Sequence, residues 1–79
     1  MLENHNTTTH GTVRWFNCQK GFGFIDADDG REIFAHYEHI EGTGYRNLYE
    51  GDRVSFTVKQ NGDKGLMATD IRQIGSNGR

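Results

Sequence analysis

The 79-residue chain contains no proline and only one cysteine, Cys18. Without proline, slow prolyl isomerisation cannot limit folding. A lone cysteine cannot form an intramolecular disulfide, and no secretory signal segment is recognisable, so we expect a protein of the reducing cytoplasm. No apolar run approaches the roughly 18 residues that a membrane-spanning helix needs, which predicts that the chain has no membrane partner.

A strong excess of charge of one sign is also missing. Nine Lys and Arg residues stand against eleven Asp and Glu residues, which gives a formal net charge of -2 and a pI of about 6.0. This balance excludes a uniformly basic polyanion binder of the histone type, but it leaves room for a local basic patch. Any contact with nucleic acid is therefore expected to depend on stacking more than on charge.

Catalytic and metal-binding patterns are missing as well. The chain lacks a nucleophile elbow, a phosphate-binding glycine loop and an enclosed acid pair, so we expect neither an enzyme nor a cofactor. The possible soft metal ligands are widely scattered; they are His5, His10, Cys18, His36 and His39. A structural zinc site needs four ligands at tight spacing, usually with several cysteines, so no metal site is expected.

The sequence does contain short β-like runs separated by turn residues. We predict strands at 11–18, 22–27, 32–37, 52–60 and 66–74, with turns at 28–30 and 61–63. A long connection from 38 to 51 has room for one short helical turn. Three strands, an excursion and two more strands predict an all-β, five-stranded antiparallel barrel. Residues 1–10 are expected to form a flexible leader, 11–74 the single domain and 75–79 a flexible tail.

Alternation along these strands predicts the core. Val54, Phe56 and Val58 alternate with polar residues, and the inward rows of the second and third strands hold only small or aliphatic side chains. The other core candidates are Ile25, Ile33, Ala35, Ile40, Leu48, Met67 and Ile71. This core is adequate without Phe22 or Phe24.

Aromatic residues share rows with charged ones in two neighbouring strands. In "KGFGFID", Lys20, Phe22, Phe24 and Asp26 fall on one face of an extended strand. In "EIFAHY", the residues Glu32, Phe34 and His36 repeat that arrangement. A hairpin through residues 28–30 would place the two rows side by side, so the rings would form one exposed patch, which usually marks a binding surface.

Two ligands suit such a patch. Flat rings beside a few cations fit the faces of unpaired nucleobases, each stack contributing about 1 to 3 kcal/mol. A proline-rich or extended peptide in an aromatic groove is the alternative, which would make the chain a protein-interaction module. Trp15 can join the patch while Val13 enters the core only if a bulge interrupts the first strand; otherwise Trp15 is a core ring.

The segments "RWFNCQKGFGFID" and "IFAHY" resemble the two ribonucleoprotein motifs of the bacterial cold-shock protein family, and "GTGYRNLYEGDRVSF" is similar to that family's long loop and fourth strand. The resemblance covers residues 11 to about 72. The first motif is also similar to one in the RNA recognition motif fold, but there the shorter motif comes first and a helix and a strand intervene. The order found here favours the cold-shock family.

The resemblance implies an oligonucleotide-binding (OB-fold) barrel that holds single-stranded RNA or DNA, with a preference for pyrimidine-rich strands, on its outer aromatic face. It further implies a monomeric RNA chaperone or regulator of gene expression. The stacking residues implied by it are Trp15, Phe22, Phe24, Phe34, His36, Tyr37 and Tyr45. Arg14 and Lys20 match basic positions that contact the nucleic-acid backbone or base edges, and Glu32 and Lys64 match weaker polar contacts.

The chain departs from the family pattern at two places. Glu38 and His39 stand where the family often has a serine-alanine pair, and the added negative charge is expected to weaken binding beside Tyr37. Leu66 follows Gly65 where the family often has proline, which leaves the last loop more flexible.

Overall fold

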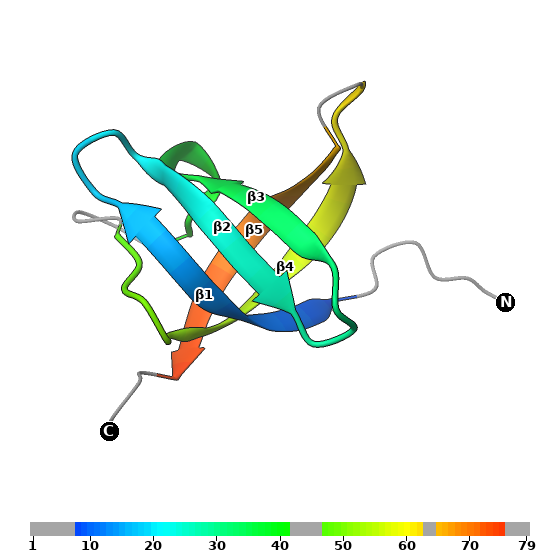
Figure 1. Cartoon of the computed structure of the whole chain (residues 1–79), viewed down its shortest axis with the longest axis horizontal. Helices are drawn as coiled ribbons and strands as arrows, with labels where there is room; N and C mark the ends of the chain where they lie inside the picture. Colours follow the sequence, from blue (N-terminus) through cyan, green and yellow to red (C-terminus); the bar gives the residue numbers. More distant parts are fainter. Residues whose placement is uncertain (1–7, 42–46, 63–64, 76–79) are drawn as a thin grey trace, which may run out of the picture.

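The computed structural model describes residues 8–41, 47–62 and 65–75, which form five strands and one short 3-10 helix (Figure 1). The elements in chain order are β1 (Thr9–Asn17), β2 (Phe22–Ala27), β3 (Glu32–His36), η1 (Tyr37–His39), β4 (Arg53–Gln60) and β5 (Leu66–Gly75). The five predicted strands are all present, with ends that differ from the expected ones by at most two residues. The helical turn η1 lies at the start of the long connection.

The strands close into a barrel in the order β1-β2-β3-β5-β4, which confirms the predicted fold class. One detail of that prediction is wrong, because β3 and β5 pair in parallel while the other neighbouring strands are antiparallel. Strand direction cannot alternate all the way round a closed ring with an odd number of members. A five-stranded barrel must therefore contain a parallel pair, and it lies where β5 completes the ring after the long connection.

The barrel interior is filled by small and aliphatic side chains around one phenylalanine, Phe56, which is 1% exposed. Most of the predicted core residues are buried, and Val58 packs against the core while only partly buried. Met67 was expected inside, but it is only partly buried and Ala68 takes the interior position. The buried apolar residues are Val13, Ile25, Ala27, Ile33, Ala35, Ile40, Leu48, Val54, Phe56, Ala68 and Ile71.

The outward position of Met67 has a local cause. The register of β4 with β5 shifts between Ser55 and Thr57, and Asp70 adopts a left-handed backbone with φ of 52°. This bulge changes which residues of β5 face inward, so Ala68 and Ile71 are both buried although simple alternation would separate them. Inward-facing and outward-facing side chains therefore do not alternate strictly along β5.

A second bulge lies in β1. Its register with β2 shifts between Val13 and Trp15, as expected if both Val13 is buried and Trp15 is on the surface. Arg14 and Trp15 are both exposed as a result. The alternative of a core tryptophan is thus wrong.

Some predictions concern parts of the chain that the structure does not describe. The expected leader and tail fall mainly on residues 1–7 and 76–79, outside the described residues, so the predicted division into leader, domain and tail stays a prediction. Within the described ranges, no helix is long and apolar enough to cross a membrane.

Candidate functional site

Aromatic side chains from β1, β2, β3 and η1 gather on one outer surface of the barrel, which we call the aromatic face. Its members are Trp15, Phe22, Phe24, Phe34, His36 and Tyr37. The register of β2 with β3 sets Phe22 opposite His36 and Phe24 opposite Phe34, as the hairpin prediction required. Trp15 lies opposite Phe24 on β1, so three neighbouring strands contribute to one surface.

Four of the rings touch one another in a continuous series, and the other two form a pair of their own. The ring centroid of Phe24 lies 5.7 Å from that of Trp15 and 5.6 Å from that of Phe34. Phe22 is 6.0 Å from Trp15 and from Phe34, and the rings of His36 and Tyr37 are 4.7 Å apart. These contacts are tilted or edge-to-face, arrangements that aromatic pairs favour and that fix their orientation.

These side chains are still partly exposed to solvent. The side chains of β2 and β3 on this surface are partly buried, while Trp15 is 39% and Tyr37 is 45% exposed. The opposite sides of the same strands carry the fully buried Ile25 and Ile33. The rings therefore pack against one another outside the barrel core.

Two glycines, in β2 and just before it, allow neighbouring elements to pack closely against this part of the chain. A Cβ atom at Gly23 would overlap the carbonyl oxygen of Trp15 across the β1–β2 pair. A Cβ atom at Gly21 would overlap the Tyr37 ring, and Gly21 also has a φ of 80°, which disfavours other residues. Its carbonyl oxygen accepts a hydrogen bond of 2.8 Å from the Tyr37 backbone N–H. Glycine at these positions thus brings β1 and η1 against β2.

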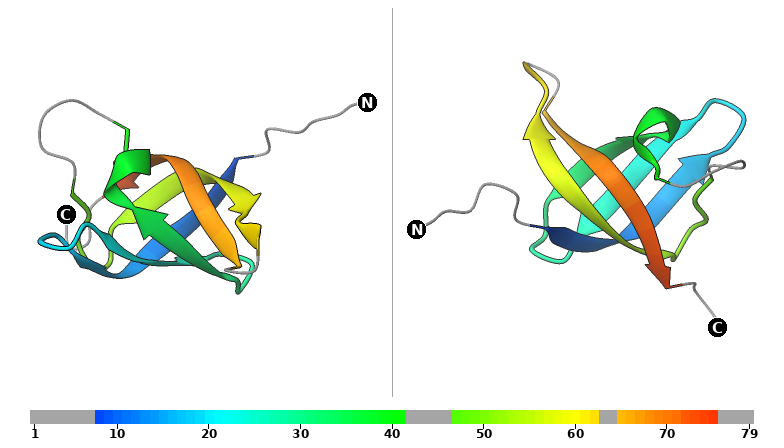
Figure 2. Two further views of the ribbon diagram at one scale, coloured as in Figure 1. Left: turned by 90° about the horizontal axis from the view of Figure 1, so that it is seen from above. Right: turned by 180° about the vertical axis from the view of Figure 1, so that it is seen from behind.

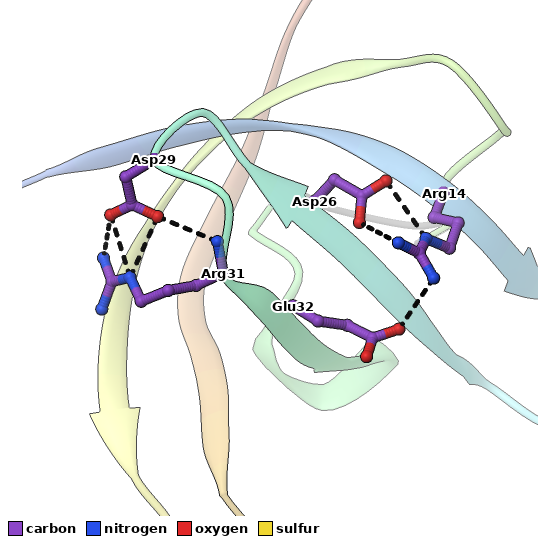
Figure 3. Close-up of polar contacts among 5 residues, drawn as sticks. All are labelled: Arg14, Asp26, Asp29, Arg31 and Glu32. Carbon is purple, nitrogen blue, oxygen red and sulfur yellow. Dashed lines mark hydrogen bonds and ion pairs between the residues drawn. The ribbon is translucent and has the colours of Figure 1, made fainter.

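An ion-pair cluster occupies one end of the aromatic face (Figure 3). The Arg14 guanidinium lies 2.9 Å from an Asp26 carboxylate oxygen and 3.1 Å from a Glu32 oxygen. The hydrogen bond from Arg14 to Asp26, followed by the negative charges of Asp26 and Glu32, raises the pKa of Arg14 above its ordinary value. Arg14 was expected to contact the nucleic-acid backbone or base edges, but its single positive charge is already paired with the carboxylates of Asp26 and Glu32.

Lys20 lies at the other end, in the turn between β1 and β2. The Asn17 side-chain oxygen accepts hydrogen bonds from the backbone N–H groups of Gln19 and Lys20, at 3.0 and 2.9 Å, which orders this turn. Within the described part of the chain, the ammonium group of Lys20 has no carboxylate partner. It is thus available to an incoming anion.

His36 is tied to the following helical turn. Its Nδ1 atom accepts a hydrogen bond of 3.2 Å from the Glu38 backbone N–H, which caps η1. The Glu38 carboxylate lies 3.7 Å from the same nitrogen. The residue that departs from the family pattern therefore places a negative charge directly beside the aromatic face.

A hollow of about 470 Å³ opens at the edge of the aromatic face, between β3 and the turn that joins β4 to β5. Its lining comprises Phe24, Glu32, Phe34, Asn61, Gly65 and Leu66. Sequence reasoning did not single out Asn61 or Leu66 as site residues. The local pattern gives no signal for them, because they reach the site only through the pairing of β5 with β3 that closes the barrel.

The structure brings nearly all the predicted site residues together. The aromatic ones form the face itself, and Arg14, Lys20 and Glu32 lie at its rim. Tyr45 and Lys64 lie outside the described residues. Among the residues that are described, no three His, Cys, Asp or Glu side chains are grouped closely enough to hold a metal ion.

Comparisons with known proteins agree with this arrangement. Residues 9–74 match the model of the "'Cold-shock' DNA-binding domain" family. The chain is 49% identical over 65 residues to the "Major cold shock protein CspA" of Pseudomonas aeruginosa, covering 82% of this chain and 93% of that protein. It is 44% identical over 63 residues to the "Cold shock protein CspC" of Bacillus subtilis, covering 80% of this chain and 94% of the relative.

A solved structure described as "drosophila Unr CSD456" superposes with a TM-score of 0.73 at 27% sequence identity. The match covers 94% of this chain but only 29% of that one. The similarity to it therefore concerns one portion of a longer protein.

Proposed function

The chain belongs to the cold-shock DNA-binding domain family, and from that membership we propose that it binds single-stranded RNA and DNA by stacking bases on the aromatic face. The observation that carries the proposal is the continuous series of solvent-reachable rings on β1, β2 and β3. Each base stacked on such a ring contributes about 1 to 3 kcal/mol, with little dependence on which base it is.

The proposed activity is that of an RNA chaperone or gene regulator that works by binding alone. The protein captures bases that become transiently unpaired, and so it shifts structured RNA toward open conformations by mass action, without ATP and without a catalytic step. A ligand can shift such an equilibrium only through its differential affinity for the two states. Stacking supplies that difference, because paired bases do not expose their faces.

The proposed roles of the described residues follow from their positions on the surface, and those of Tyr45 and Lys64 from the family resemblance alone. Trp15, Phe22, Phe24, Phe34, His36 and Tyr37 stack bases, with Tyr45 as a further stacking residue. Lys20 contacts phosphate, and Glu32 and Arg14 contact base edges at the far rim, with Lys64 as a further polar contact. We further propose a cytoplasmic monomer with a preference for pyrimidine-rich strands and a single binding domain over residues 11–74.

The test uses Trp15, the only tryptophan of the chain, as the reporter. We expect a short pyrimidine oligonucleotide at micromolar concentration to change the tryptophan emission, because a base stacked on the indole replaces its solvent. A Phe34→Ala variant should need a higher oligonucleotide concentration for the same change. A Tyr49→Ala variant is the matched control, since Tyr49 is an exposed ring (59%) before β4 that does not belong to the aromatic face.

Two results would contradict the proposal. The first is emission that does not respond to any oligonucleotide. The second is a response to a proline-rich peptide alone, which would favour a protein-interaction module on the same face.

A further inference from the structure

A second hollow, of about 430 Å³, lies on the outer surface of β4 and β5. These two strands form the side of the barrel turned away from the viewer in Figure 1 and toward the viewer in the right-hand view of Figure 2. The lining is strongly polar and comprises Thr8, Ser55, Phe56, Thr57, Lys59, Asp70 and Arg72. None of these residues belongs to the aromatic face.

The β5 bulge shapes this hollow. Asp70 lies at the bulge with a φ of 52°, and it is the only residue other than glycine with a positive φ in the described part of the chain. Bulges re-aim side chains and are common beside binding sites, and an unusual backbone angle at a surface position is a reason to look for a function. No described residue donates a hydrogen bond to the Asp70 carboxylate, so its oxygens are available as acceptors.

The hollow also carries two positive charges, of which, within the described part of the chain, Lys59 is the unpaired one. Lys59 is exposed and has no ion-pair partner among the described residues. Arg72 makes one long contact, 3.4 Å from a Glu41 oxygen, and its side chain is 69% exposed. Two cations, one free carboxylate and the hydroxyl groups of Ser55 and Thr57 therefore share one concave surface.

This hollow is connected to the aromatic face through the strand register. Phe34 on β3 is in register with Met67 on β5, and Met67 is in register with Lys59 on β4. Residues in register share one side of a sheet, so all three lie on the outer surface. Neighbouring strands are about 4.8 Å apart, which places Lys59 about 10 Å from Phe34 around the barrel.

We propose that the β4–β5 hollow binds the ribose-phosphate backbone of an RNA strand that continues past Phe34 and over Met67. Lys59 contacts a phosphate, Arg72 adds positive charge to the hollow from its position beside Glu41, and the Asp70 carboxylate accepts a hydrogen bond from a ribose 2′-hydroxyl. The 2′-hydroxyl is the group by which a protein distinguishes RNA from DNA. The inference rests on the proposed function, since it extends the path of the same ligand.

The experiment compares oligouridine strands of about six and about twelve nucleotides, both within the range of site sizes known for such barrels. A Lys59→Ala variant should bind the longer RNA about three- to tenfold more weakly and the shorter RNA as the unchanged protein does. The salt slope for the longer RNA should become shallower by about 0.7, the value for one phosphate contact. Arg31→Ala is the matched control, because it removes one exposed cation from the β2–β3 turn and should not distinguish the two lengths.

A second variant tests the hydroxyl contact. Asp70→Gly keeps the backbone angle, which glycine adopts freely, and removes the carboxylate. The preference for the longer RNA over an oligodeoxyuridine of equal length should fall at least about threefold, while the same preference measured on the shorter strands does not change. Circular dichroism should show both variants folded.

The outcomes separate this inference from the proposed function. If both lengths bind and Lys59→Ala weakens neither, the aromatic face is active and the extended path is wrong. If Asp70→Gly leaves the preference for the longer RNA over the equally long DNA unchanged, the proposed contact between Asp70 and the 2′-hydroxyl is wrong. If the unchanged protein binds neither length, the proposed function and the extension both fail.

Discussion

Among single side chains, a phenylalanine inside the barrel and one on its outer surface should differ in how much stability the protein loses when each is replaced by alanine. Phe56 is 1% exposed and fills the interior, whereas Phe34 is partly buried and contacts two other rings of the aromatic face. Truncating a buried phenylalanine removes its burial energy and leaves a cavity, which costs about 3 to 5 kcal/mol. A ring that already meets solvent leaves no enclosed cavity.

We therefore expect Phe34→Ala to reduce affinity for single-stranded nucleic acid by about 1 to 3 kcal/mol, the contribution of one stack, and to destabilise the protein less than Phe56→Ala does. Oligonucleotide titration and urea unfolding of both variants provide the measurement. If Phe34→Ala instead unfolded the protein and left the affinity of the folded fraction intact, Phe34 would be a core residue.

Asp26 acts in the opposite sense to the rings, because its charge repels phosphate and engages Arg14. Asp26→Asn should raise affinity about two- to fivefold at low salt by removing one negative charge and loosening the Arg14 ion pair, and salt should abolish the gain. The loss of stability should be small, as for other exposed ion pairs.

The matched control is Asp29→Asn, which removes the same charge from an aspartate paired with Arg31 in the β2–β3 turn (Figure 3). It should change affinity less than Asp26→Asn does. Equal gains from the two variants would mean that only the net charge of the molecule matters, and the position of the Arg14 cluster would then be irrelevant.

At the level of strands and turns, local patterns predicted most of the site and missed the places where elements far apart in the sequence meet. The Phe22 and Phe34 rows could be predicted because a tight turn fixes how β2 pairs with β3. For Trp15, alternation left the surface and the core both open, and it showed only that a surface position needs a bulge beside Val13, which the structure contains. Met67 could not be placed, since its position depends on a bulge at Asp70 and on a parallel contact with β3 that local alternation does not encode.

The β2–β3 turn should make stability depend on pH in the acid range. Hydrogen bonds from Arg53 lower the pKa of Asp28, and hydrogen bonds from Arg31 lower that of Asp29. Because both folded-state pKa values lie below the unfolded value of about 3.9, the stabilisation is fully present above that value and is lost as the pH falls through the folded-state values.

We expect the melting temperature to fall steadily from about pH 4 downward, and to fall less steeply in an Asp28→Asn variant. Thermal unfolding between neutral pH and about pH 2 measures this. Parallel curves for the variant and the unchanged protein would show that the 2.8 Å ion pair of Asp28 with Arg53 does not contribute to the pH dependence of stability.

The distribution of charge over the whole barrel decides how binding should respond to salt. Every arginine in the described ranges has a carboxylate partner: Arg14, Arg31, Arg53 and Arg72. The described lysines, Lys20 and Lys59, have none, and they lie at opposite ends of the proposed ligand path. Two free cations predict about two phosphate contacts, so log affinity should fall with log salt with a slope of about -1.4 for a strand long enough to reach both.

A strand that covers only the aromatic face should show about half that slope, because it reaches Lys20 alone. Titrations of short and long oligonucleotides over a range of salt concentrations give both values. A slope of about -5 or steeper would mean that the arginines leave their carboxylates to bind phosphate, and that charge rather than stacking dominates affinity. With a formal net charge of -2, such a molecule would have to rearrange its ion pairs on binding, whereas a stacking surface works as it stands.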